Sequence, residues 1–362
     1  MKKKIYTIGI QGLPAKYGGF ETFTDYLSQY ISDNFDLTVY CSSNLYKDKI
    51  EKYQKAKLKY IPLNANGVQS VPYDILSILL SVKDSDNSND VLLLLGSSGA
   101  IILPFISIFK KRKIIFNMGG LEWKRSKWNK FARWFLKFSE KIAVKYSDVI
   151  VADNKGIQEY LSSEYGVKSH IIAYGGDHAS KLDLTDELAE KYPFLKESYY
   201  VGVARVQPDN NIDMILEAFK QIPYKSLVFV GNWDVSDYGK SLKEKYSKVS
   251  NLHLVDAIYD LQILDQIRSN CVAYIHPQSS GGTNPSLVEA MHLELPIIAT
   301  DVNFNRYTTQ EKAFYFSNMN ELIDNVLYNN RDAHNLCAKD MKEIANQIYT
   351  WKYVVNEYQK LF

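Results

Sequence analysis

Residues 281–291, GGTNPSLVEAM, lie between two short apolar runs at 271–277 and 295–300. This order predicts a buried strand, a loop of small residues, the start of a helix and then the next strand of a parallel sheet. Glycines let the backbone approach an anion closely, and the free N–H groups of a helix N-terminus favour phosphate. An ordinary tight connection between a strand and a helix is the simpler alternative.

The same stretch supplies candidate binding residues. We expect Thr283 or Ser286 to cap the helix. Gly282, Thr283 and Asn284 are then placed to contact the diphosphate of a nucleotide, and Glu289, one to two turns into the helix, is placed to accept hydrogen bonds from a ribose diol. The sequence therefore predicts a site for a nucleotide diphosphate here, with a sugar phosphate as its cargo.

The length of the chain and the distribution of its apolar runs predict two domains, since 362 residues exceed one compact core. Most runs lack alternation, as do strands of a parallel sheet that is covered on both faces. We expect an α/β protein of two Rossmann-like doubly wound domains, residues 1–175 and 176–345, with an aromatic-rich helix at about 346–362 returning to the first domain. The expected strands are 5–10, 37–41, 57–61, 91–95, 113–117 and 148–152, then 199–203, 226–230, 252–255, 272–275 and 297–299.

The composition is that of an ordinary globular protein, with 46% hydrophobic and 23% charged residues. Cys41, Cys271 and Cys337 are far apart, which indicates reduced thiols in a cytoplasmic protein. The apolar run at the start is too short for a signal peptide. Residues 91–109 carry no charge, but the glycines and serines at 96–99 and Pro104 divide them. A strand, a turn and an apolar helix therefore explain this segment better than a membrane span.

Charge is distributed unevenly along the chain. Residues 1–180 carry 25 Lys and Arg against 17 Asp and Glu, whereas the remainder carries 18 against 24. Residues 110–145 alone hold 12 basic and 2 acidic residues, which suggests a surface that meets anions. A helix in this segment has two stripes. We expect one to face the core, through Trp128, Phe131, Phe135, Phe138 and Ile142, and the other to contact a membrane surface, through Lys127, Lys130, Trp134, Lys137 and Lys141. A solvated helix face is the alternative.

Two further loops follow expected strands. Residues 9–21 are rich in glycine and open a helix, so Gly18 and Gly19 are candidates for phosphate or sugar binding. The spacing departs from the dinucleotide fingerprint, which disfavours a Rossmann dehydrogenase. Arg205 stands just past the strand at 199–203, where a guanidinium suits a diphosphate; a surface arginine is the alternative.

The sequence gives little indication of a metal site or of a catalytic nucleophile. Asp84 and Asp86 match an Asp-x-Asp metal site only superficially, because they stand in a run of Ser, Asn and Asp that indicates a solvated loop. His276 is interpreted as structural. We therefore expect no cofactor and no metal requirement.

These motifs, taken in order, resemble the family-four retaining glycosyltransferases of GT-B fold, and the resemblance covers essentially the whole chain. The segment from Gly281 to Glu289 takes the place of that superfamily's Glu-x7-Glu signature, and Arg205 that of its diphosphate arginine. The closer resemblance is to bacterial polysaccharide rhamnosyltransferases of the beta-1,4-L-rhamnosyltransferase type. It rests on residues 9–14, 17–21, 120–123, 281–286 and 349–351.

Three positions depart from those patterns. The first signature glutamate falls at Gly281, and the lysine that follows the arginine falls at Asn210. Both losses fit a 6-deoxy sugar donor. In the narrower group an aspartate commonly precedes Gly-Leu-Glu-Trp, and here that position is Gly119.

The resemblance implies transfer of L-rhamnose from dTDP-L-rhamnose to a sugar on undecaprenyl diphosphate, at the inner face of the plasma membrane, with no nucleic acid involved. It implies two domains facing each other across a cleft, Arg205 and Glu122 as catalytic residues, Asn210 in the donor site, and Glu21, Glu122 and Trp123 near the acceptor. A GT-B enzyme that uses a UDP-hexose shares every gross feature. A nucleotide-sugar epimerase is disfavoured, because it needs neither an acceptor nor a membrane surface.

Overall fold

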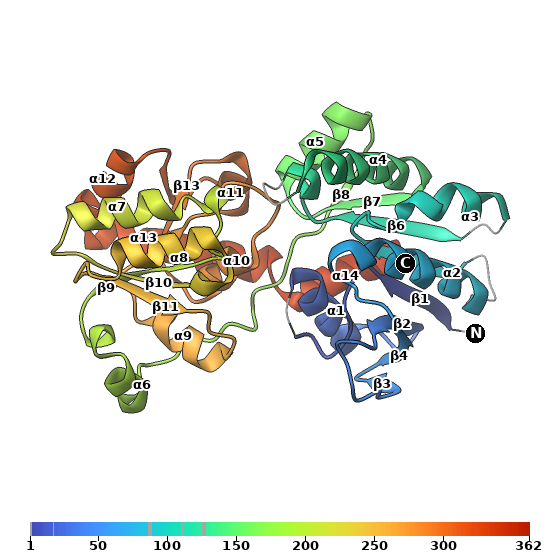
Figure 1. Ribbon diagram of the computed structural model, residues 1–362, viewed down its shortest axis with the longest axis horizontal. Coiled ribbons are helices and arrows are strands. Elements are labelled where there is room, and N and C mark those ends of the chain that lie inside the picture. Colours follow the sequence, from blue (N-terminus) through green and yellow to red (C-terminus); the bar gives the residue numbers. More distant parts are fainter. Residues whose placement is uncertain (1, 17, 86–88, 110–111, 125–127) are drawn as a thin grey trace. The chain divides into compact units, whose positions relative to one another are not determined.

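The computed structural model describes residues 2–16, 18–85, 89–109, 112–124 and 128–362, and it divides into two compact units. Unit 1 comprises Met1–Tyr174 together with Trp351–Phe362, and unit 2 comprises Gly175–Thr350. Each unit is built on one mainly or wholly parallel sheet with helices between the strands (Figure 1).

The sheet of unit 1 has the strand order β3-β4-β2-β1-β5-β6-β7-β8, and only the β3–β4 pair is antiparallel. The order reverses direction between β1 and β5, which makes this pair the topological switch point of the sheet. The strands are β1 Lys3–Ile8, β2 Phe35–Ser42, β3 Lys52–Tyr53, β4 Ala56–Ile61, β5 Val91–Leu95, β6 Lys113–Met118, β7 Val149–Ala152 and β8 His170–Ile171. The helices are α1 Gly19–Tyr30, α2 Ser70–Asp84, α3 Leu103–Phe109, α4 Lys130–Tyr146, α5 Lys155–Tyr165 and α14 Trp351–Leu361.

The sheet of unit 2 is parallel throughout, with the order β11-β10-β9-β12-β13-β14 and its switch point between β9 and β12. Its strands are β9 Tyr199–Val203, β10 Ser226–Gly231, β11 Leu252–Asp256, β12 Tyr274–His276, β13 Ile297–Thr300 and β14 Phe314–Phe316. Its helices are α6 Asp186–Lys191, α7 Ile212–Gln221, α8 Asp237–Tyr246, α9 Leu261–Ser269, α10 Pro285–His292, α11 Asn303–Thr308, α12 Met319–Tyr328 and α13 Arg331–Ile348.

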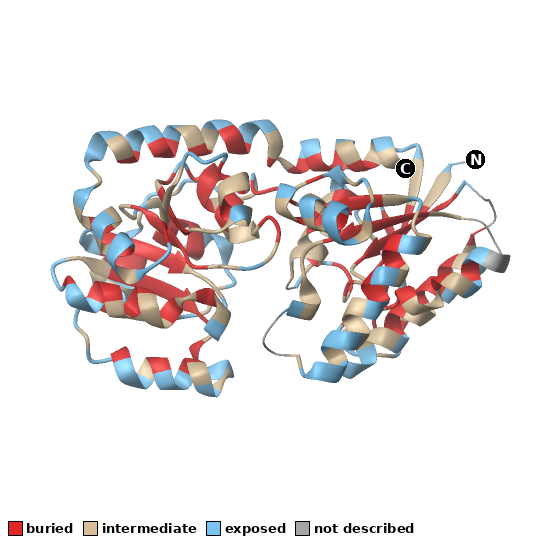
Figure 2. Ribbon diagram, turned by 90° about the horizontal axis from the view of Figure 1, so that it is seen from above, coloured by how far each residue is buried: buried red, intermediate tan, exposed pale blue. Residues whose placement is uncertain are grey.

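The sequence explains where many helices begin, because an Asn, Asp, Ser or Thr side chain accepts a hydrogen bond from the first turn. Asn154 does so for α5, Asp260 for α9 and Asn318 for α12. Most strands are buried, as expected for sheets covered on both faces, and Figure 2 shows the sheet of each unit as its buried centre. The short edge strands β3 and β8 are the exceptions.

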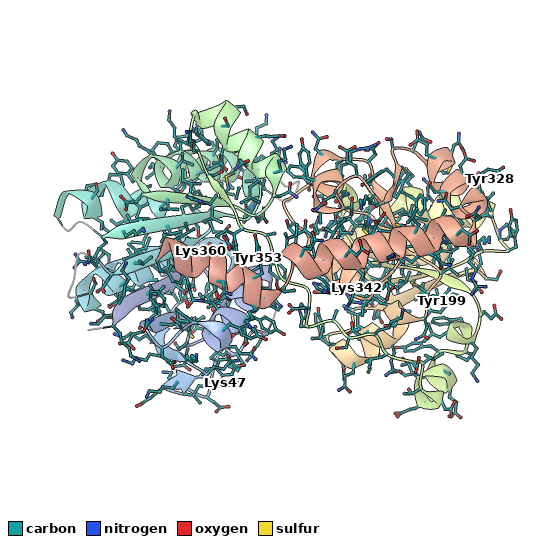
Figure 3. All side chains as sticks on the ribbon, turned by 180° about the vertical axis from the view of Figure 1, so that it is seen from behind. Lys47, Tyr199, Tyr328, Lys342, Tyr353 and Lys360 are labelled. Carbon is teal, nitrogen blue, oxygen red and sulfur yellow. The ribbon has the colours of Figure 1, made fainter. Side chains whose placement is uncertain are left out.

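The end of the chain differs from the single helix expected over 346–362. Helix α13 ends at Ile348 and α14 starts at Trp351 (Figure 3). The Tyr349 carbonyl accepts a hydrogen bond from the Gly176 N–H at 2.8 Å and lies 2.8 Å from His292 Nε2. Its partners therefore lie outside α13 and α14. Helix α14 packs in unit 1, where Trp351 stacks on Tyr26 with ring centroids 4.5 Å apart.

The uncharged segment 91–109 folds as predicted into strand β5, a turn and the short helix α3. Within the described residues, every helix is too short or too polar to cross a membrane.

Candidate functional site

The glycine loop of unit 2 leaves β12 and enters α10 at its N-cap, Asn284. Gly281 has φ +122, a backbone conformation that favours glycine, and Gly282 and Thr283 are buried. The prediction that Thr283 or Ser286 caps the helix is wrong. Asn284 occupies the cap position, and its side chain makes no capping hydrogen bond. Pro285 at the first helical position needs no hydrogen-bond acceptor.

His276, at the end of β12, contacts the side chain of Asn284. The Asn284 amide Nδ2 lies 3.3 Å from His276 Nε2. Burial lowers the pKa of His276 to about 3, so the imidazole is neutral and accepts this hydrogen bond at Nε2. His276 therefore orients the side-chain amide of Asn284 at the N-terminus of α10, which is a structural role of the kind expected.

Glu289 belongs to a buried network of charged side chains. Its Oε2 lies 2.6 Å from Arg268 Nη1, and its Oε1 lies 3.2 Å from His178 Nε2. Arg268 is fully buried, and its Nη2 donates to Asp265 at 2.5 Å. Burial alone would raise the pKa of Glu289, but Arg268 and His178 outweigh it and lower that pKa to about 2. The carboxylate is thus held ionised, and each of its oxygens retains a second lone pair for a hydroxyl donor.

Sequence reasoning found Glu289 but missed Arg268, Asp265 and His178. The spacing of Asp265 and Arg268, three residues apart on one helix, indicates a local ion pair. Nothing in the sequence places that pair beside Glu289. The connection depends on packing, since Gly176 lies so close to α10 that a Cβ atom there would come within 2.8 Å of the Val288 carbonyl group.

Arg205 lies on the loop after β9, as predicted, and its side chain is exposed. Strands β9 and β12 are neighbours, so this loop and the glycine loop share one stretch of the sheet edge. Ser279 Oγ joins them by donating to the Asp209 carbonyl at 2.6 Å. Asn210 is buried, and its amide donates to the Arg205 carbonyl at 2.7 Å. Asn210 therefore shapes the loop, while its contact with a donor stays a prediction.

In unit 1 the loop after β1 is held together by Glu21. This buried carboxylate accepts a hydrogen bond from the Gln11 N–H at 2.9 Å. Gly18 has φ +120, and a Cβ atom there would lie only 2.0 Å from Glu21 Oε2. Burial raises the pKa of Glu21 although the Gln11 hydrogen bond opposes it. Gly18 and Gly19 lead into α1 as expected, and their role in binding a ligand stays a prediction.

The loop after β5 also depends on a buried carboxyl group. Asp74 on α2 accepts a hydrogen bond from Ser98, and burial raises the pKa of Asp74 to about 7. Ser139 on α4 donates to the Ser97 carbonyl. These contacts fix the loop at the switch point of unit 1.

Glu122 and Trp123 form a short 3-10 turn after β6. Trp128 Nε1 donates to Glu122 Oε1 at 3.2 Å. The Trp123 ring lies beneath two ammonium groups, with Lys137 Nζ 4.8 Å and Lys124 Nζ 5.4 Å from its centroid. Glu122 and Trp123 thus lie at the carboxyl edge of this sheet, as does Glu21, the third predicted acceptor residue, on the helix after β1. The contact of these three residues with an acceptor stays a prediction.

Helix α4 differs from its predicted stripes. Phe131 and Phe138 were expected in the core, but they are 74% and 42% exposed, and Trp134 between them is 61% exposed. The side chains that face the core are Ser139, Glu140, Ala143 and Val144. Trp128, Phe135 and Ile142 of the predicted core stripe are half-buried, so the prediction is wrong for Phe131 and Phe138.

The predicted basic stripe is also divided. Lys130 and Lys141 are exposed beside the aromatic rings. Lys137 instead pairs with Glu140 at 3.3 Å and with Glu164 at 2.9 Å. Lys127 lies outside the described residues.

Asp84 of the Asp-x-Asp pattern ends α2 rather than standing in a solvated loop. Its carboxylate pairs with Lys59 and accepts from the Tyr40 hydroxyl, and Ser85 is buried against Asp90. Asp86 lies outside the described residues. In the parts of the chain that the structure describes, no three His, Cys, Asp or Glu side chains are grouped to hold a metal ion.

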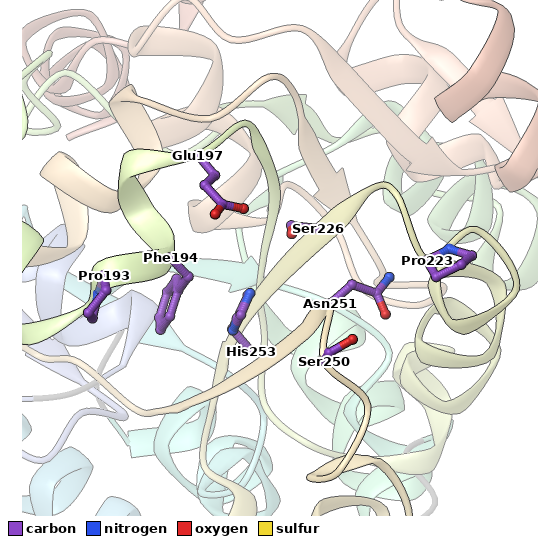
Figure 4. A pocket seen from close by; sticks show the side chains of 8 residues that line it. All are labelled: Pro193, Phe194, Glu197, Pro223, Ser226, Ser250, Asn251 and His253. Atoms are coloured by element: carbon purple, nitrogen blue, oxygen red, sulfur yellow. The ribbon is translucent and has the colours of Figure 1, made fainter.

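A separate hollow of about 420 Å³ opens at the amino ends of β10 and β11 (Figure 4). It is lined by Pro193, Phe194, Glu197, Pro223, Ser226, Ser250, Asn251 and His253. The His253 ring stacks on Phe194 at 4.1 Å, and the Asn251 amide is occupied by two backbone carbonyls. Because ligands of parallel sheets bind at the carboxyl ends of the strands, this hollow is not the candidate site.

Two family models together cover most of the chain. Residues 185–339, which hold Arg205, the glycine loop and Glu289, match the model of glycosyl transferases group 1. The chain is a glycosyltransferase. The second unit of this glycosyltransferase carries the group 1 domain, and residues 2–177 match a domain of unknown function, DUF1972.

The glycosyltransferase is 21% identical to an uncharacterised glycosyltransferase of Methanocaldococcus jannaschii, over 95% of this chain and 94% of the relative. Sucrose-phosphate synthase from Thermosynechococcus elongatus has a TM-score of 0.81 at 14% identity, covering 99% of this chain and 98% of that one. Anabaena HepE, solved in complex with UDP-glucose, has a TM-score of 0.76 at 12% identity and full coverage of both chains. The predicted GT-B-like fold with two parallel-sheet α/β domains is confirmed.

Proposed function

We propose that this glycosyltransferase moves L-rhamnose from dTDP-L-rhamnose to a sugar on undecaprenyl diphosphate, in the assembly of a bacterial surface polysaccharide. The observation that carries the proposal is the glycine loop that leads into α10, with Glu289 held ionised behind it. The group 1 match over this segment and the UDP-glucose complex of HepE support a nucleotide sugar as the donor.

The donor would be bound by unit 2. Arg205 and the glycine loop share one stretch of the sheet edge, so a diphosphate there would meet a guanidinium and the free N–H groups at the start of α10. The ribose hydroxyls would donate to Glu289, whose ionised form is the better acceptor.

The preference for a 6-deoxy sugar rests on Gly281. The wider superfamily's first signature glutamate falls at this position, where a carboxylate could bind sugar hydroxyls. With φ +122, residue 281 adopts a backbone conformation that residues with a side chain rarely accept. The loop therefore favours glycine here, which supports a donor with fewer hydroxyls to recognise.

The reaction would retain the anomeric configuration. The bond from C1 of the sugar to the diphosphate oxygen breaks, and a bond from C1 to the acceptor oxygen forms on the same face. The acceptor hydroxyl gives its proton to the departing diphosphate. Arg205 and the loop amides stabilise the charge that grows on this leaving group, which is where electrostatic catalysis is most effective.

Helix α4 supports peripheral attachment to an anionic membrane. Its exposed aromatic stripe is Phe131, Trp134 and Phe138, with Trp134 stacked on Phe138 at 5.7 Å. Lys130 and Lys141 lie on the same side of the helix. Aromatic rings beside lysines suit the boundary between lipid headgroups and acyl chains.

Mass spectrometry of the products tests the proposal. The enzyme is incubated with a synthetic polyprenyl-diphosphate sugar and, in parallel, dTDP-L-rhamnose, UDP-glucose, UDP-galactose and UDP-N-acetylglucosamine. We expect addition of one deoxyhexose from dTDP-L-rhamnose alone, with anomeric retention by NMR. Addition of a hexose from a UDP donor alone would replace the proposed donor with a UDP-hexose. A nucleotide sugar with altered stereochemistry and no glycosylated lipid would instead reveal an epimerase.

A further inference from the structure

The carboxyl edge of unit 1 presents an aromatic ring at its switch point. Phe20 is the second residue of α1, the helix that follows β1. Its ring packs against the buried core of unit 1 and also lies beside the loops after the next two strands of the sheet, β5 and β6. Ligands of open α/β sheets bind in the crevice outside the carboxyl ends of the strands where the strand order reverses. Phe20 therefore stands where this rule places a ligand.

Glycines surround the ring on both of those loops. A Cβ atom at Gly119 would lie 2.5 Å from Phe20 Cζ and 2.9 Å from Cε1, so the ring tip touches the backbone there. Gly96 has φ +95, and a Cβ atom on it would lie 3.9 Å from Phe20 Cε2. Neither loop therefore extends a side chain over the ring at these points, and Phe20 remains only partly buried.

The same contacts show what a side chain at position 119 would do. A Cβ atom there would lie within 3.0 Å of the Phe20 ring, so the ring would have to shift. With glycine at 119 the ring keeps its place beside the backbone of this loop.

We propose that the Phe20 ring is the platform on which the sugar ring of the acceptor stacks, with Gly119 kept free of a side chain so that the platform stays open. This inference rests on the proposed function, because it assigns the acceptor to unit 1. A pyranose presents C–H groups on one face, and these suit the electron-rich face of an aromatic ring. Pockets of this kind combine an apolar wall with a few polar groups, which Glu122 on the loop after β6 supplies.

Phe20 variants test the platform with a matched control on the same helix. Phe20→Leu should raise the KM for the lipid-linked acceptor at least tenfold, leave the Kd for thymidine diphosphate unchanged and change the melting temperature little. Phe20→Trp should keep acceptor KM within a fewfold of wild type. Phe23→Leu removes a buried ring that packs 4.7 Å from Tyr358, so it should lower the melting temperature without affecting acceptor KM.

Gly119→Ala provides the second arm. Its Cβ atom should displace the Phe20 ring and raise acceptor KM, and the double variant Gly119→Ala/Phe20→Leu should be no worse than the poorer single variant. Additive effects of the two substitutions would contradict a shared action through the ring.

A binding assay that needs no transfer separates this inference from the proposed reaction. Saturation-transfer NMR with octyl rhamnoside, glucoside and galactoside should detect the sugar ring protons on wild type and lose them on Phe20→Leu. Phe20-dependent binding without transfer would leave the platform standing and overturn the proposed reaction. Transfer by wild type with unchanged acceptor KM in Phe20→Leu would overturn the platform alone. Glycosides that bind both proteins equally, or neither, would also overturn it.

Discussion

The two units have similar folds, but the pKa values of the buried carboxyl groups near the carboxyl edges of their sheets are shifted in opposite directions. In unit 2 the carboxylate of Glu289 is held ionised by Arg268 and His178. In unit 1 the carboxyl groups of Glu21 on α1 and Asp74 on α2 are buried against loops, and desolvation raises their pKa. The fold positions the loops of each unit, whereas the buried neighbours of each carboxyl group set its charge state.

The largest effect is expected from Arg268→Ala, which would break the charged network of unit 2. Removing this buried guanidinium leaves Glu289 and Asp265 without their cation, which should lower the free energy of unfolding by about 3–5 kcal/mol. Chemical denaturation measures it. Arg306→Ala is the control, because its pair with Asp301 is about one-third exposed and should contribute only ~1 kcal/mol. Equal losses of unfolding free energy in both variants would mean that the buried network stabilises the fold no more than an exposed ion pair does.

Asp74→Asn probes the opposite electrostatics of unit 1. The unfolded carboxyl titrates near 3.8 and the folded one at about 7, so the folded state holds an extra proton between these values. The stabilisation is complete below pH 3.8 and is lost as pH rises through 7, a change on the order of 4 kcal/mol. We expect the variant to match wild type near pH 4 and to exceed it in stability at pH 8. A constant difference between the two proteins at all pH values would contradict the raised pKa.

Arg205→Ala tests the assignment of the diphosphate to unit 2. Loss of about 2–4 kcal/mol of transition-state stabilisation should lower kcat/KM for the donor roughly 30- to 1000-fold, with little change in the melting temperature. Arg331→Ala removes another exposed arginine of the same unit, at the start of α13, and should keep full activity. Equal activity of the two variants would remove Arg205 from the site.

A smaller effect is expected on the outer face of unit 1. Phe131→Ser with Trp134→Ser should weaken sedimentation with anionic vesicles at any salt concentration. Lys130→Glu with Lys141→Glu should weaken it mainly at low salt, because each lysine contributes about 1 kcal/mol and is screened. Leu336→Ser, which alters an exposed leucine of α13, is the control. Vesicle binding that survives both double substitutions would mean that α4 is only a solvated helix.

Each strand predicted from the sequence overlaps an observed one, because buried parallel strands have continuous apolar runs. The strands that escaped prediction are β3, β8 and β14, which are two or three residues long and carry little pattern. Helix α4, in contrast, has a clear pattern that was misinterpreted. Its 3.6-residue aromatic periodicity was assigned to the core, but the periodicity defines a face and does not say what covers it.

The candidate site was predictable where it depends on local backbone. The glycine loop, the start of α10 and the place of Arg205 all follow from strand ends. The side chains that hold Glu289 ionised were not predictable, since His178 and Glu289 are 111 positions apart in the sequence. The Phe20–Gly119 contact is likewise a product of strand order, because the two residues follow different strands, β1 and β6.

Hydrogen exchange with and without thymidine diphosphate tests most directly the claim that unit 2 holds the nucleotide. The account predicts slower exchange in peptides covering residues 203–211 and 281–291. It predicts no change in the peptide covering 96–99 of unit 1. Protection confined to loops of unit 1, with unchanged exchange at 281–291, would contradict it.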